Sequence, residues 1–124
     1  MASGEPIVVI DHRIAPEELA RLAELFFEDM IKYVLDVDRG VAAVGGELHA
    51  DAEALLLEAG SEQRSLWGAN YYPGVGEDAC IEYTSLINIR PGQGNRSMEV
   101  QDPALRARIQ ELTFALIGRG ESLP

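Results

Sequence analysis

The sequence predicts one α+β domain of two layers. It has a largely antiparallel sheet in the order strand–helix–strand–strand–strand–helix, with a long N-terminal helix and a C-terminal helix on one face. Three observations predict it. The chain of 124 residues is long enough for one domain with its own core. Short β-branched or alternating runs are typical of strands, and two segments carry apolar residues at helical spacing. We expect residues 1–124 to form a single domain, ordered from about residue 5 to residue 118, with a frayed C-terminal tail.

The charge of the chain is one-sided, with 21 acidic residues against 10 basic ones and a formal net charge of -11. Such a chain repels phosphate backbones, which argues against nucleic-acid binding. Its single cysteine, Cys80, excludes an internal disulfide and suits a reducing compartment. The sequence shows neither a signal-peptide pattern nor an apolar run of the ~20 residues that a membrane-spanning helix needs. We therefore expect a cytoplasmic protein without membrane contact.

The first third of the chain predicts a strand and then one long helix. Residues 6–11 form a short β-branched run, and Pro16 followed by acidic residues marks a helix start. Apolar residues then recur in steps of three or four over residues 19–44, ahead of two glycines that suit a helix end. A helix of about 45 Å exceeds a small sheet, so its far end is a candidate homodimer interface. The alternative is a helix ending near Ile31 and a hairpin turning at residues 38–40; we favour the long helix.

The rest of the chain predicts a meander and a last helix. Residues 47–58 are ambiguous, because their alanines and leucines favour a helix whereas charged and apolar residues alternate as in a strand. We interpret them as a strand that pairs, through a glycine-containing turn, with residues 65–72. After a glycine-rich loop, residues 80–90 alternate again and complete an antiparallel meander. An Asp-Pro pair at residues 102–103 begins the last helix, which Gly118 ends.

Alternation assigns the faces of these strands. Trp67 and Tyr71 share the face that we expect in the core, whereas Asn70 and Tyr72 share the opposite, polar face. In the following strand, the face expected beneath the helices carries Ile81, Tyr83, Ser85, Ile87 and Ile89. The polar face is predicted to gather His49, Asp51, Asn70, Asn88 and Arg90. This convergence of polar residues is the best indication of a functional site.

The loop over residues 90–97 carries amide and guanidinium groups in a stretch without acids. Two guanidinium groups can grip a carboxylate or a phosphate, and the glycines leave the backbone open. The candidate ligand-binding residues are Asn70, Asn88, Arg90, Asn95, Arg96 and Ser97. The alternative is a structural connection whose arginines pair with the acidic N-terminal half.

A metal site is the other candidate. If residues 47–53 form a strand, His49, Asp51 and Glu53 project from one face and can hold a divalent metal such as Zn, Mn or Fe. Alternate charges are also typical of any half-exposed strand, and in a helix the three side chains would not share a face. This divalent metal is the one cofactor that the sequence suggests.

Three motifs in order carry a resemblance to a known family: G-G-E-L-H-A-D-A-E (residues 45–53), L-W-G-A-N-Y-Y-P (66–73) and S-L-I-N-I-R-P-G-Q-G-N-R-S (85–97). Together they resemble a prokaryotic family known as domain of unknown function 5674, from about Ile10 to the last helix. The resemblance implies a small stand-alone cytoplasmic protein, and it implies no activity. The residues that match the family motifs are His49, Asp51, Glu53, Trp67, Gly68, Asn70, Asn88, Arg90, Asn95, Arg96 and Ser97.

The leading functional hypothesis is a binding or regulatory module. It would recognise a small anion or a protein partner through the polar sheet face and the 90–97 loop. One alternative is a metal-assisted hydrolase that uses His49, Asp51 and Glu53. Another is an acidic, antitoxin-like neutraliser of a basic partner. Nucleophilic catalysis has little support, because Cys80 begins an apolar strand without a basic neighbour. Whether the protein is an enzyme stays open at this point.

Overall fold

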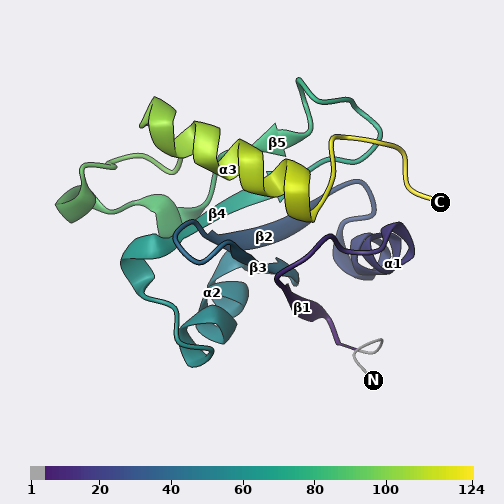
Figure 1. Ribbon diagram of the computed structural model, residues 1–124, viewed down its shortest axis with the longest axis horizontal. Helices are drawn as coiled ribbons and strands as arrows, with labels where there is room; N and C mark the ends of the chain where they lie inside the picture. Colours follow the sequence, from purple (N-terminus) through teal and green to yellow (C-terminus); the bar gives the residue numbers. More distant parts are fainter. Residues whose placement is uncertain (1–4) are drawn as a thin grey trace.

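Five antiparallel strands form one sheet in the order β1-β3-β2-β4-β5 in the computed structural model, which describes residues 5–124 (Figure 1). The elements are β1 (Ile7–Ile10), α1 (Pro16–Phe26), β2 (Ile31–Asp36), β3 (Val41–Gly45), α2 (His49–Glu58), β4 (Leu66–Tyr71), β5 (Ile81–Glu82) and α3 (Pro103–Leu116). Three 3-10 turns lie at Gln63–Ser65, Leu86–Asn88 and Pro91–Gln93. The predicted α+β class, with a largely antiparallel sheet, is confirmed.

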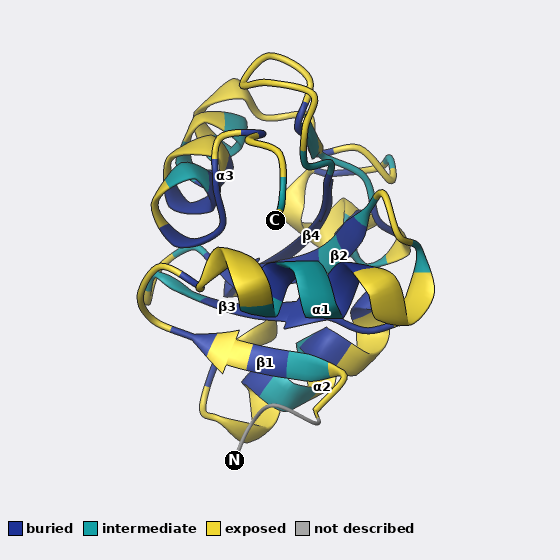
Figure 2. Ribbon diagram, turned by 90° about the vertical axis from the view of Figure 1, so that its right-hand side faces the viewer, coloured by how far each residue is buried: buried dark blue, intermediate teal, exposed yellow. Residues whose placement is uncertain are grey.

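Helices cover both faces of the sheet. The larger core lies on the face packed by α1 and α3, which contribute Leu22 and Leu112 among others. On the opposite face, Ala52 and Leu56 of α2 pack against Val34 of β2 and its neighbours. Figure 2 shows α1 and α3 on one side of the strands and α2 on the other. The structure therefore has three layers, and the two-layer prediction with one polar sheet face was wrong.

The prediction of a long first helix was also wrong. Helix α1 ends at Phe26, and Glu28 has a positive φ of 63°, which a helix does not continue through. The chain then forms the hairpin β2–β3, whose turn is held by the Asp36 carboxylate accepting hydrogen bonds from the backbone N–H of Asp38 (3.0 Å) and Arg39 (2.9 Å). Strand β2 is buried on both faces, so apolar and polar residues do not alternate along it. The spacing of its apolar residues therefore resembles that of a helix.

Residues 47–58 form no strand. They contain helix α2, in which Ala52 and Leu56, four residues apart, both face the core. The alternation at its start is therefore no sign of a strand, because His49 is buried whereas Asp51 is exposed. The helix propensity of alanine and leucine was the better signal.

Of the strand predicted over residues 80–90, only Ile81–Glu82 pairs with the sheet, as strand β5. After β5, Thr84 forms an isolated bridge with Glu99. The chain then turns inward, and the Asn88 amide takes the place of the missing ladder. Its Oδ1 accepts from the Gly68 N–H at 2.9 Å, and its Nδ2 donates to the Gly68 carbonyl at 2.9 Å. Only Ile81 and Tyr83 of the predicted buried face pack on the α1/α3 core, whereas Ile87 packs on the α2 side.

Several predictions from local sequence are confirmed. Strands β1 and β4 and the start of α1 lie where the pattern placed them, and Asp102 caps α3 by accepting from the Ala104 N–H at 2.9 Å. Trp67 is in the α1/α3 core.

The C-terminal tail, which we expected to fray, is hydrogen-bonded to the loop after β4: the N–H groups of residues 74 and 76 donate to the carbonyls of residues 121 and 120. Over residues 5–124, no helix has the length and apolar character to span a membrane.

Candidate functional site

Arg90 is bound by the protein itself. Its guanidinium donates from Nε to the Ile87 carbonyl at 3.1 Å, from Nη1 to the Gln63 carbonyl at 2.6 Å, and from Nη2 to the Leu66 carbonyl. The guanidinium carbon also lies 4.0 Å from the centre of the Trp67 ring, a cation–π contact. Arg90 thereby joins the start of β4 to the 86–88 turn, and it has few donors left for a ligand.

Asn95 is engaged in the same way. Its Nδ2 lies within 3.0 Å of the carbonyls of Asn88, Ser97 and Glu99, among which its two protons are shared, and its Oδ1 accepts from the Gln101 N–H at 2.9 Å. Asn95 is therefore the centre around which the 90–97 loop folds. Arg96 is exposed, and Ser97 accepts from the Glu99 N–H at 3.1 Å. The six predicted ligand-binding residues do not converge on one ligand.

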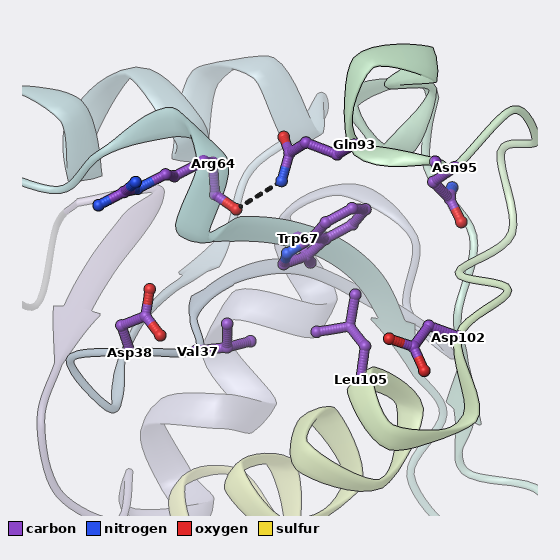
Figure 3. Close-up of a pocket in the computed structure, with 9 residues that line it drawn as sticks. Val37, Asp38, Arg64, Trp67, Gln93, Asn95, Asp102 and Leu105 are labelled. Atoms are coloured by element: carbon purple, nitrogen blue, oxygen red, sulfur yellow. Dashed lines mark hydrogen bonds between the residues drawn. The ribbon is translucent and has the colours of Figure 1, made fainter.

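A polar pocket of about 310 Å³ does lie beside this loop, next to Trp67 (Figure 3). Its polar side chains already have protein partners. Gln93 donates to the Arg64 carbonyl at 3.0 Å, Asp38 accepts from the Ser65 hydroxyl, and Asp102 caps α3. We call this the Trp67 pocket. Its shape is concave, but its polar groups serve the fold.

A second pocket, of about 340 Å³, lies where the first turn of α2 meets β4 and residues 84–87. We call it the His49 pocket. Its lining residues are Lys32, Leu48, His49, Ala50, Asn70, Thr84, Ser85, Leu86, Ile87 and Met98. Gly68 allows this arrangement, because a Cβ at residue 68 would lie 2.7 Å from the Ser85 Cβ and 3.2 Å from His49 Cδ2. A glycine in the strand thus lets the imidazole and the serine approach the sheet.

His49 has one ring nitrogen occupied and one without a protein partner. Its Nε2 lies 2.8 Å from the Ala69 carbonyl, which can only accept, so Nε2 carries the proton. Burial, with a smaller contribution from the nearby Lys32 charge, lowers the pKa of His49 to about 4. The imidazole is therefore neutral at pH 7. Its Nδ1 is then an acceptor, and the one hydrogen bond of the neutral ring within residues 5–124 is the one from Nε2, whereas the nearby Asn70 amide would stabilise only the protonated ring.

Asn70 also keeps a polar atom unpaired. Its Nδ2 donates to Glu82 Oε1 at 2.8 Å, which fixes the orientation of the amide, because a flipped amide would turn Oδ1 toward the carboxylate. The Asn70 Oδ1 is buried and has no partner within the described part of the chain. Unsatisfied buried acceptors are rare in folded proteins and call for an explanation.

The charge of the His49 pocket is opposite to that of the chain. Its one charged lining residue is Lys32, and no Asp or Glu lines it, although the chain holds 21 acids. Leu48 is the N-cap residue of α2 and gives the first N–H groups of the helix no side-chain acceptor. A helix N-terminus without a cap and an ammonium group both favour an anion. The mouth is apolar, with Leu48, Leu86 and Met98 exposed.

The predicted metal ligands are separated by the helix. His49 is turned toward β4, whereas Asp51 is exposed on α2. Within residues 5–124, no three His, Cys, Asp or Glu side chains lie close enough together to hold a metal ion.

The structure brings together two of the predicted polar residues, His49 and Asn70, and separates both from the 90–97 loop. The sequence analysis missed Lys32, Ser85, Leu86 and Met98. Lys32 is the sole lysine beside nine arginines, which is a weak signal. Ser85, Leu86 and Met98 give no signal in the sequence, since their role depends on where residues 84–98 lie in the fold.

Fold and site together define a class: a small three-layer α+β domain with a pocket of about 340 Å³ beside the first turn of α2. The chain belongs to the family described as Protein of unknown function (DUF5674), whose model matches residues 8–116. The resemblance inferred from the three motifs is thereby confirmed. No curated protein matches the chain. No solved structure matches it either.

Proposed function

We propose that the protein is a small-molecule-binding module that holds a small organic anion in the His49 pocket. The observation that carries the proposal is the lining itself: one lysine and no acid, in a chain with a net charge of -11. Glu82 lies next to the lining residue Asn70 but is not part of the lining. An anion in the pocket would be attracted by Lys32 and by the open N-terminus of α2.

The rest of the lining selects an organic anion. The exposed side chains of Leu48, Leu86 and Met98 surround the mouth and offer apolar contact to a carbon chain. A volume of about 340 Å³ is at the lower end for small-molecule pockets, which favours a ligand of metabolite size. The Leu86–Asn88 turn contributes indirectly in this proposal, because Asn88 holds Met98 in place by donating to its carbonyl at 3.1 Å.

The proposal is tested by nuclear magnetic resonance titration of the ¹⁵N-labelled protein with butyrate and 2-hydroxybutyrate, and with the neutral butyramide. We expect the carboxylates to shift the amide signals of residues 48–50 and 84–87, and butyramide to bind far more weakly. Lys32→Gln should weaken carboxylate binding by about 10- to 100-fold, the value of one hydrogen bond to a charged group.

Arg96→Gln is the matched control, because it removes one exposed positive charge outside the pocket. It should leave the affinity unchanged. If neither carboxylate shifts the pocket signals, the proposal is wrong. If the shifts fall on residues 90–97 and disappear in the Arg96→Gln variant, the anion binds to the loop instead.

A further inference from the structure

We propose that the anion bound in the His49 pocket is a hydroxy acid, with a hydroxyl group next to its carboxylate. The inference rests on the proposed function and specifies its ligand. It starts from two acceptors on residues of the pocket lining: Asn70 Oδ1, which is buried without a partner within residues 5–124, and Nδ1 of the neutral His49 ring, whose hydrogen bond to the protein is made by Nε2.

While the imidazole is neutral, the two acceptors cannot satisfy each other. With Nε2 donating to the Ala69 carbonyl, the neutral imidazole presents a lone pair at Nδ1, and the Asn70 amide is held with its nitrogen toward Glu82. Asn70 lies close enough to the imidazole to stabilise its protonated form. An acceptor beside another acceptor needs a donor from outside, and Asn70 is 94% buried, since its exposed fraction is 6%.

The donor is a hydroxyl rather than an ammonium group. An ammonium group would meet the Lys32 ammonium in the same pocket, and no carboxylate lines the pocket to balance a second positive charge. The charge of Glu82 acts on the His49 ring, but this carboxylate is exposed and outside the pocket lining, and its Oε1 accepts from Asn70 Nδ2 and from the Tyr72 hydroxyl at 3.1 Å. A neutral O–H donates to His49 Nδ1 or Asn70 Oδ1 without adding charge.

The placement of donors and acceptors also orders the two groups of the ligand. The carboxylate belongs at Lys32 and the N-terminus of α2, since these are the positive groups. The hydroxyl belongs beside His49 and Asn70. Because His49 is the first residue of α2, the two places are adjacent, which suits a hydroxyl on the carbon next to the carboxylate. The carbon chain then points to the apolar mouth.

The experiment compares three acids of equal chain length by isothermal titration calorimetry at pH 7: butyrate, 2-hydroxybutyrate and 2-aminobutyrate. We expect 2-hydroxybutyrate to bind about tenfold more tightly than butyrate, the effect of one hydrogen bond to a group otherwise left unsatisfied. We expect 2-aminobutyrate to bind more weakly than 2-hydroxybutyrate.

A His49→Gln variant tests the acceptor directly. The glutamine Nε2 can replace the donor to the Ala69 carbonyl, while the Nδ1 lone pair is lost. The preference for the hydroxy acid over butyrate, measured within this variant, should shrink toward onefold. Arg96→Gln is again the control and should keep the full preference.

The possible results separate the two proposals. Equal affinity of butyrate and 2-hydroxybutyrate overturns the hydroxyl assignment and leaves anion binding intact. Tightest binding of 2-aminobutyrate also overturns it. If no acid binds, both proposals fail. These comparisons hold for the unmodified protein, so they decide the matter even if the His49→Gln variant does not fold.

Discussion

Strand β4 has a polar region on each side, and the two regions differ in what their side chains contact. Around Trp67, the donors of Arg90 and Asn95 are occupied by backbone carbonyls. Across the strand, His49 and Asn70 each use one polar atom for the fold and leave the other without a partner in the part of the chain that the structure describes. From the sequence alone, both regions are candidates for a binding site.

The difference teaches that residue type alone does not identify a binding site. Arginine and asparagine in a glycine-rich loop are typical of anion recognition, yet here they replace missing backbone pairing. Loops that leave a sheet carry unpaired carbonyl and N–H groups, and polar side chains are a common way to satisfy them. An unpaired acceptor in a concave lining is the stronger indication, because the protein itself gains nothing from leaving it unpaired.

The largest expected effect separates Asn88 from Asn70. Asn88→Ala leaves the Gly68 N–H, the Gly68 carbonyl and the Met98 carbonyl without their partner, so we expect it to lower the free energy of unfolding by about 4 kcal/mol. Asn70→Ala loses one hydrogen bond to an exposed carboxylate and removes an unsatisfied oxygen, so the loss should be within about 1 kcal/mol. Urea unfolding of both variants measures the difference, and equal losses would remove the contrast between the two regions.

The second-largest expected effect is a pH dependence of the protein's stability, caused by His49. The pKa of the imidazole is about 4 in the folded protein and 6.5 in the unfolded chain, so the unfolded chain takes up the proton first as the pH falls. The stability that His49 contributes is therefore complete above pH 6.5 and decreases toward pH 4, by about 3 kcal/mol in total.

The measurement is urea unfolding of the wild type and of His49→Gln between pH 7 and pH 4. The variant lacks the titrating imidazole, so its stability should fall less over this interval. Parallel curves for the two proteins would show that His49 is not buried in its neutral form.

The smallest expected contrast is between two arginines of one loop. Arg90→Met loses three hydrogen bonds to backbone carbonyls and the contact with Trp67, and we expect a loss of about 2 kcal/mol. Arg96→Met, at an exposed position, should change stability by no more than about 0.5 kcal/mol. Thermal unfolding of the two variants tests this. A large loss at Arg96 would assign that arginine a structural role as well.

Some elements could be predicted from the sequence because their signals are local. Pro16 with the acids after it, and Asp102 with Pro103, begin helices through backbone chemistry that depends on a few neighbouring residues. Strand β1 and strand β4 were found because β-branched and aromatic residues fill short runs there. The three motifs were also sufficient to indicate the family.

Other features were decided by the tertiary structure. The residues of β2 imitate a helix because α2 covers the second face of the sheet, so the strand is apolar on both sides and shows no alternation. His49 lies in a pocket beside β4, turned away from the exposed Asp51, because residues 49–58 are helical. Which polar atoms remain unpaired depends on contacts between residues 12 and 20 positions apart, Asn70 with Glu82 and His49 with Ala69. Sequence alone therefore determined where most elements begin, whereas the packing of α2 against β4 decided which side chains are available to a ligand.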